Sequence, residues 1–239
     1  MNEIIPVSGL SNQEFLEKYA KPGCIGLSGG VSLIDRVIRR AERHVGTENE
    51  WSQWSHAFLF QGRRLDGHHW VMESDLQVIR KHISLGVQEN RATKYHDEKL
   101  YSWLAVLDFQ LSEEQTRQVV REGLELVANR TRYSLRELMG SLIALRNPHL
   151  RGEDNVLARE KSLYCSAFVQ HVFHKIGIDL APGIHEKNSA PEDISRTPVP
   201  HVTYVLEREV AETRWTELPG ELRRKLRERI KKRVERRSR

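Results

Sequence analysis

The sequence is organised around a stretch that carries one of its two cysteines, Leu163-Tyr164-Cys165-Ser166-Ala167-Phe168-Val169-Gln170-His171-Val172-Phe173-His174. Its apolar residues recur at helical spacing, with a possible N-cap serine before them and a glycine suited to the C′ position after them. These residues are Ser162, Phe168, Val169, Val172, Phe173, Ile176 and Gly177. The pattern predicts a helix that begins close to Cys165.

Cys165 falls in the first turn of this predicted helix. Free backbone N–H groups and the positive end of the helix dipole favour a thiolate there, so the sulfur can act as a nucleophile near neutral pH. A free cysteine is more often an inert, buried core side chain. Taken alone, the stretch leaves both interpretations open.

Length and composition indicate a globular chain. Its 239 residues are 38% hydrophobic and 30% charged, which is enough for one domain with a sizeable core plus an appendage. No apolar run is long enough to span a membrane, and the N-terminus shows no secretory signal. Two cysteines are too few for a disulfide framework. We therefore expect a cytoplasmic protein with a free thiol, a catalytic domain over residues 1–213, and a separate segment over residues 214–239.

The basic excess of the chain lies in its C-terminal tail. Residues 221–239 carry a net charge of +8, whereas residues 1–220 carry −3. Apolar residues recur every four positions in this tail, which predicts an amphipathic helix with a narrow apolar stripe: Leu222, Leu226, Ile230 and Val234. Three roles stay open for residues 218–239, namely docking on a helix or on the domain itself, weak electrostatic contact with anionic membrane, and contact with nucleic acid.

Two runs with strand character, 54–60 and 68–73, flank the turn-prone segment 61–67 and predict a β-hairpin. A register symmetric about that turn places His56 directly opposite Glu73. Directly opposed residues share a face of the sheet, so the two side chains would lie side by side. A bulge would change this register.

The remaining patterns predict alternating strands and helices, and therefore an α+β fold in which an antiparallel sheet packs against helices. The expected helices begin near Ser11, run over 31–45, begin at the Ser112 capping box and continue to about Ala128, and run over 135–145. The expected strands cover 24–27, 76–83, 101–109 and 201–206. The first strand is expected to end at Ser28-Gly29-Gly30, and a polar loop is expected between 76–83 and 101–109.

A nucleophilic cysteine needs a base and a group that orients the base. His56 would accept the thiol proton and pass it to a leaving group, Glu73 would orient the imidazole, and the backbone N–H of Cys165 would help to bind the oxyanion. The plainer interpretations are a histidine on a sheet face and a solvated carboxylate at a strand end.

Other residues could serve a site of a different kind. Cys24 could be the nucleophile, but its surroundings have strand character and no helix follows directly. His171 and His174 lie on the same predicted helix as Cys165 but face away from it. His69 and Glu73 could bind zinc, yet no third ligand lies nearby in the sequence. We expect no metal and no cofactor. Three tryptophans near the hairpin could shape a pocket or simply pack in the core: Trp51, Trp54 and Trp70.

The segment Tyr164–Val169 resembles the Asp-Cys-Ser-Gly-Phe-Val helix start of the NlpC-type papain-like cysteine peptidases. Here it follows the Ser55-His56 strand instead of preceding it, which is the circularly permuted order. Several short motifs over about residues 20–206 together resemble the YiiX-like branch of that group. These motifs are Pro22-Gly23-Cys24-Ile25-Gly26-Leu27, Trp54-Ser55-His56-Ala57, Val71-Met72-Glu73-Ser74, Tyr133, Tyr164-Cys165-Ser166 and Ala190-Pro191-Glu192-Asp193-Ile194. The YiiX-like branch is related more distantly to lecithin:retinol acyltransferase-like enzymes. The chain departs from the family at Cys24, where an acidic residue is frequent, and at Ala57, where a residue such as valine is frequent.

The resemblance implies a papain-like fold with Cys165 as nucleophile, His56 as base and Glu73 as the orienting residue. Tyr164, Ser166 and Trp54 would line the substrate pocket or help to bind the oxyanion. The expected activity is that of a cysteine hydrolase or acyltransferase that attacks an amide or ester carbonyl of a peptide or lipid-like substrate. The alternative is a non-catalytic papain-like binding module that contacts anionic membrane or nucleic acid through the basic tail.

Overall fold

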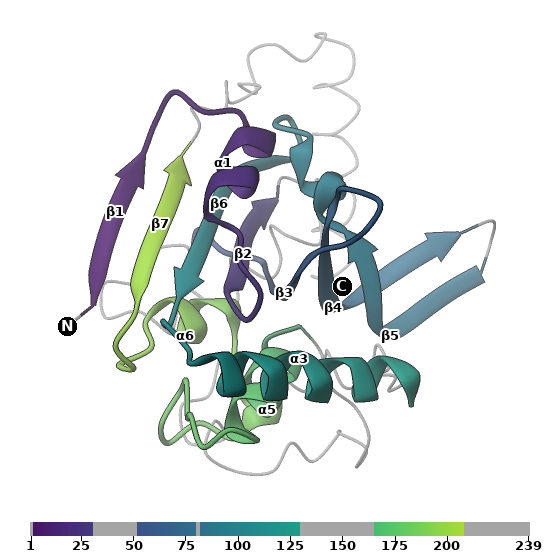
Figure 1. The fold of residues 1–239 in the computed structure, drawn as a ribbon, viewed down its shortest axis with the longest axis vertical. Coiled ribbons are helices and arrows are strands. Elements are labelled where there is room, and N and C mark those ends of the chain that lie inside the picture. The colour runs from purple at the N-terminus through teal and green to yellow at the C-terminus, as the bar shows by residue number, and fades with distance from the viewer. Residues whose placement is uncertain (1, 31–51, 80–81, 130–164, 208–239) are drawn as a thin grey trace, which may run out of the picture. The chain divides into compact units, whose positions relative to one another are not determined.

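The computed structural model describes residues 2–30, 52–79, 82–129 and 165–207, which form a seven-stranded sheet and its covering helices (Figure 1). The strands lie in the order β1-β7-β6-β2-β3-β4-β5. Their bounds are β1 Glu3–Val7, β2 Ile25–Gly30, β3 His56–Arg63, β4 His69–Ile79, β5 His82–Arg91, β6 Tyr101–Asp108 and β7 Val202–Glu207. This arrangement is an α+β fold, as the sequence predicts.

The sheet is mixed, whereas we expected an antiparallel one. Strand β1 pairs with β7 in parallel, and the other neighbouring pairs are antiparallel. The N-terminal strand went unpredicted because only five residues form it, one of them Pro6. Proline cannot donate a ladder hydrogen bond and is tolerated in a strand at the edge of a sheet.

Strand β3 alternates between two hydrophobic cores, one on each face of the sheet. Ala57 and Leu59 pack toward α5 (Cys165–His174), α3 (Glu113–Ala128) and α6 (Pro191–Ser195). Phe58 and Phe60 point to the opposite face, where α1 (Asn12–Tyr19) and the 3₁₀ turn η1 (Ala92–His96) cover them. The period of two in a strand produces this division.

Helix α5 is held by the apolar side chains that predicted it. Phe168, Val169, Val172 and Phe173 are fully buried, and Gly177 after the helix has a φ of 78°, a conformation that glycine adopts without a steric penalty. Helices α1 and α3 begin at the capping boxes of Ser11 with Glu14 and of Ser112 with Gln115. Of the apolar residues in α3, Val119 is fully buried, whereas Leu124 is exposed.

Strand boundaries differ from the predictions in three places. Strand β2 continues through Ser28-Gly29-Gly30, where we expected a break. The run 76–83 includes the end of β4 at Ile79 and the start of β5 at His82, so it belongs to two strands and not one. Much of the expected polar loop before β6 is in fact β5 and η1. The division into two strands was missed because 76–83 contains neither glycine nor proline.

The predicted helices over 31–45 and 135–145 and the basic tail lie outside the described residues, as do Trp51, Tyr133 and Tyr164. Within the part of the chain that the structure describes, no helix has both the length and the apolar character that a membrane crossing requires.

Candidate active site

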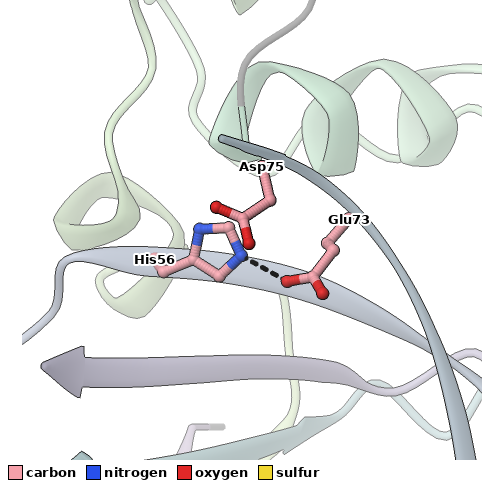
Figure 2. A group of neighbouring side chains, drawn as sticks. All are labelled: His56, Glu73 and Asp75. Atoms are coloured by element: carbon pink, nitrogen blue, oxygen red, sulfur yellow. Dashed lines mark hydrogen bonds and ion pairs between the residues drawn. The ribbon is translucent and has the colours of Figure 1, made fainter. Parts of the chain in front are cut away.

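The side chains of His56 and Glu73 meet on adjacent strands of the sheet. Nε2 of His56, the first residue of β3, lies 2.7 Å from Oε2 of Glu73 in β4. Figure 2 shows the carboxylates of Glu73 and Asp75 turned toward the imidazole, and ligand atoms of the three residues lie within 4.8 Å of one another. The two strands thus bring the predicted base and its orienting residue together.

The predicted register of this hairpin is nevertheless wrong. Leu59 pairs with Met72, and a bulge lies between Phe60 and Gly62. Continuing the Leu59 pairing puts Glu73 opposite Phe58, which is two residues from His56. Because the register shifts by an even number of residues, His56 and Glu73 stay on the same face and meet diagonally.

Glu73 is fully buried, and its carboxylate is surrounded by hydrogen-bond donors. Oε2 accepts from the Tyr95 hydroxyl at 2.6 Å as well as from His56. Oε1 accepts from Asn90 Nδ2 at 2.8 Å and from Lys94 Nζ at 2.7 Å. A buried carboxylate is tolerated when it is paired and hydrogen-bonded in this way.

These contacts keep Glu73 ionised. Burial by itself would raise the pKa of its carboxyl group, but the hydrogen bond from His56 and the positive charge of Lys94 outweigh burial and hold that pKa well below its usual range. An ionised Glu73 can only accept hydrogen bonds, so Nε2 of His56 carries the proton between them.

His56 also interacts with Cys165. Burial would lower the pKa of the imidazole, yet the charge of the Cys165 sulfur and a hydrogen bond to it, together with Glu73, raise that pKa well above its ordinary value. Since Nε2 faces Glu73, Nδ1 is the nitrogen left for the sulfur. Cys165 is the first residue of α5, it is partly exposed, and its helix packs on β3. His56 is thus coupled electrostatically to Cys165 and hydrogen-bonded to Glu73.

The other cysteine has the character of a core thiol. Cys24 is 3% exposed, and burial raises the pKa of its thiol to about 12, with the nearby Asp108 adding to the shift. A thiol with so high a pKa stays protonated near neutral pH and is a poor nucleophile. This environment disfavours the unpermuted alternative, in which Cys24 attacks the substrate.

His56, Glu73 and Asp75 have the composition of a metal site, but a cationic side chain already lies beside two of them. Nζ of Lys94 lies 2.7 Å from Glu73 and 2.8 Å from Asp75. A positive charge therefore already bridges the two carboxylates, and a metal ion would be repelled by it. The residues present do not fit a metal.

The other histidines considered as ligands lie beside acidic side chains outside this cluster. His69 faces Glu17 at 3.7 Å and does not join the cluster around Glu73. His171 lies 3.2 Å from Glu186, and His174 lies 3.1 Å from Asp179. These contacts match the expectation that His171 and His174 play no part at Cys165.

Two of the three residues expected to line a pocket serve the fold instead. Ser166 is fully buried, and its hydroxyl donates to the backbone oxygen of Ser189 at 2.7 Å. Trp54 is 6% exposed and belongs to the core beneath α5. Both assignments to the pocket are therefore corrected to packing roles. The third residue, Tyr164, lies outside the described residues.

The donors around Glu73 were not predicted from the sequence. Asn90 comes from the end of β5, and Lys94 and Tyr95 come from η1, in a region that we interpreted as a polar loop. The one usable signal was Tyr95, a large aromatic residue inside a polar segment, which is fully buried here.

Comparisons with known proteins do not show a family for this chain. No protein-family model matches the chain, and no curated protein matches it. A solved structure that resembles it is the crystal structure of metalloprotein yiiX from Escherichia coli O157:H7, DUF1105. That protein is 14% identical over 77% of this chain and 95% of its own, with a TM-score of 0.48. It is a distant neighbour, and the permuted NlpC-type assignment stays a prediction.

Proposed function

We propose that this protein is a cysteine-dependent hydrolase or acyltransferase that attacks an amide or ester carbonyl through Cys165. His56 is the base, and Glu73 orients it. The observation that supports this most is the imidazole of His56, which contacts the fully buried Glu73 at 2.7 Å on one side and the sulfur of Cys165 on the other. A nucleophile, a base and an orienting residue in this order are the parts that acyl transfer needs.

The reaction follows from these contacts. His56 takes the proton of Cys165, and the sulfur attacks the carbonyl carbon to form a tetrahedral oxyanion. The backbone N–H of Cys165, at the start of α5, donates to that oxyanion. When the oxyanion collapses, the bond to the leaving amine or alcohol breaks, and His56 gives it the proton. The product of this half-reaction is a thioester on Cys165.

The thioester is then released by a second attack. Water, or an amine or alcohol of an acceptor, gives a proton to His56 as it attacks the carbonyl carbon, and the thiolate leaves. Water makes the enzyme a hydrolase, and another acceptor makes it an acyltransferase. Glu73 stays ionised throughout and stabilises the imidazolium that forms in each half-reaction.

We further propose that the fold is the permuted NlpC-type papain-like fold of the YiiX-like branch. The support is the resemblance of the motifs, the order of His56 before Cys165, and an α+β fold in which the cysteine begins a helix packed on the sheet. In this family, the substrates are peptide amides or lipid esters and amides, and we expect one of these two classes here.

The test is to trap the acyl-enzyme. Purified protein is incubated with panels of acyl amides and lipid esters, quenched in acid, and analysed by peptide mass spectrometry. We expect an acyl adduct on the peptide that contains Cys165 and none in Cys165→Ala. If no adduct forms with either class, although the protein is folded, the alternative of a non-catalytic binding module is favoured.

A further inference from the structure

The short segment from Ser189 to Glu192 is hydrogen-bonded to the neighbours of both Cys165 and His56. On one side, the backbone oxygen of Ser189 accepts a 2.7 Å hydrogen bond from the hydroxyl of Ser166, the residue after Cys165. Both serines are buried. The first turn of α5 is therefore fixed to this segment directly beside the sulfur.

On the other side, Oε2 of Glu192 accepts a 2.7 Å hydrogen bond from the hydroxyl of Ser52. The same Ser52 oxygen accepts from the backbone N–H of Trp54 at 3.0 Å, two residues before His56. Ser52 and Glu192 are 4% and 8% exposed, so water competes little for these bonds. The chain that leads into β3 is thereby tied to α6.

Glu192 is itself held firmly by its short helix. The backbone N–H of Ala190 donates to Asp193 at 2.7 Å, and Ile194 is fully buried in the core beneath α5. The second oxygen of Glu192, Oε1, accepts from Nε of Arg196 at 2.6 Å. Both carboxylate oxygens thus have a donor, and the group that bonds Ser52 has little freedom to move.

We infer that Glu192 is a positioning residue for the proposed reaction, because it fixes the start of β3, and with it His56, relative to Cys165. The inference rests on the proposed function. Its physical basis is that two elements from distant parts of the sequence must hold a base and a nucleophile in contact, and a misplacement of about 1 Å costs on the order of 100-fold in rate. Ser189 is hydrogen-bonded to the residue after Cys165, and Glu192 is hydrogen-bonded to Ser52 before β3, so one short segment holds both elements.

The test measures the rate at which iodoacetamide alkylates Cys165 in full-length protein that carries Cys24→Ala, so that one cysteine remains. Glu192→Ala and Ser52→Ala should each slow the reaction at about pH 6 by roughly 10- to 100-fold, because thiolate formation there depends on His56. At about pH 9.5, where hydroxide can deprotonate a thiol without the imidazole, the rates should nearly converge.

Three further variants separate positioning from general stability. Glu192→Gln keeps an acceptor for Ser52 and should stay within about threefold of the parent. Arg196→Ala removes the exposed partner of Glu192 and leaves the Ser52 bond in place, so it should slow the reaction less than Glu192→Ala does. The double variant Glu192→Ala/Ser52→Ala should be slowed by much less than the product of the two single effects, since both changes remove the Ser52–Glu192 hydrogen bond.

The possible failures are distinguishable. If Glu192→Ala or Ser52→Ala reacts at the parent rate near pH 6, Glu192 positions nothing and the inference is overturned. A reaction that is faster at every pH would mean that the substitution loosens the fold and exposes Cys165, and this result also overturns the inference. If Glu192→Ala does not fold, Ser52→Ala carries the test alone, and the same outcomes overturn the inference. If instead the parent reacts no faster than a simple thiol near pH 6, the proposed function fails and the inference falls with it.

Discussion

The hydroxyl of Tyr95 donates a 2.6 Å hydrogen bond to Oε2 of Glu73, the same oxygen that bonds His56. The ring of Tyr95 stacks on Phe58, with 4.2 Å between the ring centroids. Phe58 in turn lies against Gly26 on the neighbouring strand β2, where a Cβ atom would come within 2.1 Å of the Phe58 ring. The site is therefore coupled to the packing of one aromatic stack in the core.

Gly26→Ala tests this coupling. The added methyl group must displace Phe58, and overpacking of this kind costs about 1–3 kcal/mol of unfolding free energy. The shift should reach Glu73 through Tyr95, so the rate of Cys165 alkylation should fall as well. Urea unfolding and alkylation kinetics measure the two effects. The second change Phe58→Leu should recover part of the stability, and a Gly26→Ala protein as stable and reactive as wild type would contradict the packing described here.

Lys94 supplies the positive charge that offsets two carboxylates, Glu73 and Asp75. Lys94→Met should lower the free energy of unfolding by about 3 kcal/mol, because it leaves the buried Glu73 without its cation. The same replacement at the exposed Lys99 is the matched control and should change stability by less than about 0.5 kcal/mol. Chemical denaturation measures both, and equal effects of the two variants would show that Lys94 does not stabilise the cluster.

The raised pKa of His56 predicts a specific dependence on pH. Its imidazole should still be protonated in the folded protein at pH values where a free histidine, with a pKa near ~6.5, is neutral. Because the folded pKa lies above the unfolded one, the stability that His56 contributes is complete below about pH 6.5 and is lost as the pH rises through the folded value. NMR titration of the imidazole measures this pKa directly. Titration at or below the ordinary value would contradict the described contacts, and Glu73→Gln should lower the measured pKa.

The sequence predicted two parts of the site. One is the helix that carries Cys165, which depends on local apolar spacing, and the other is the shared sheet face of His56 and Glu73, which depends on the alternation of side chains along a strand. Helix α5 followed from its apolar spacing, and a helix over Cys165–His174 is confirmed. The pairing of His56 with Glu73 was predicted from a wrong register, and it is found because the actual shift is even and keeps both side chains on one face. A shift by one residue would have separated them.

The remaining parts depend on contacts between distant segments. Lys94 and Tyr95 reach Glu73 only because β5 returns beside β4 and places η1 over the site. That return was not predicted, because no glycine or proline lies between the end of β4 at Ile79 and the start of β5 at His82. The parallel pairing of β1 with β7 joins residues near opposite ends of the described chain. No local sequence pattern predicts pairing between segments so far apart in the chain.

The basic tail stays a prediction. Deleting residues 218–239 should leave the Cys165 reaction on a small substrate nearly unchanged and should weaken binding to anionic vesicles or nucleic acid at low ionic strength. The reason is that residues 1–220 carry a net charge of −3 and have no comparable basic cluster. Vesicle sedimentation and nucleic-acid titration, each repeated at high salt, measure the loss. Aggregation or a much lower melting temperature of the truncated protein would mean that the tail is part of the core.

The central claim is that Cys165 reacts because His56 and Glu73 activate it. The most direct measurement is labelling by an electrophilic thiol probe near neutral pH, located by peptide mass spectrometry. We predict labelling at Cys165 in wild type and in Cys24→Ala, none in Cys165→Ala, and a rate reduced by roughly 10²- to 10⁴-fold in His56→Ala. Labelling that is lost in Cys24→Ala but kept in Cys165→Ala, or that is indifferent to His56→Ala, would contradict the account.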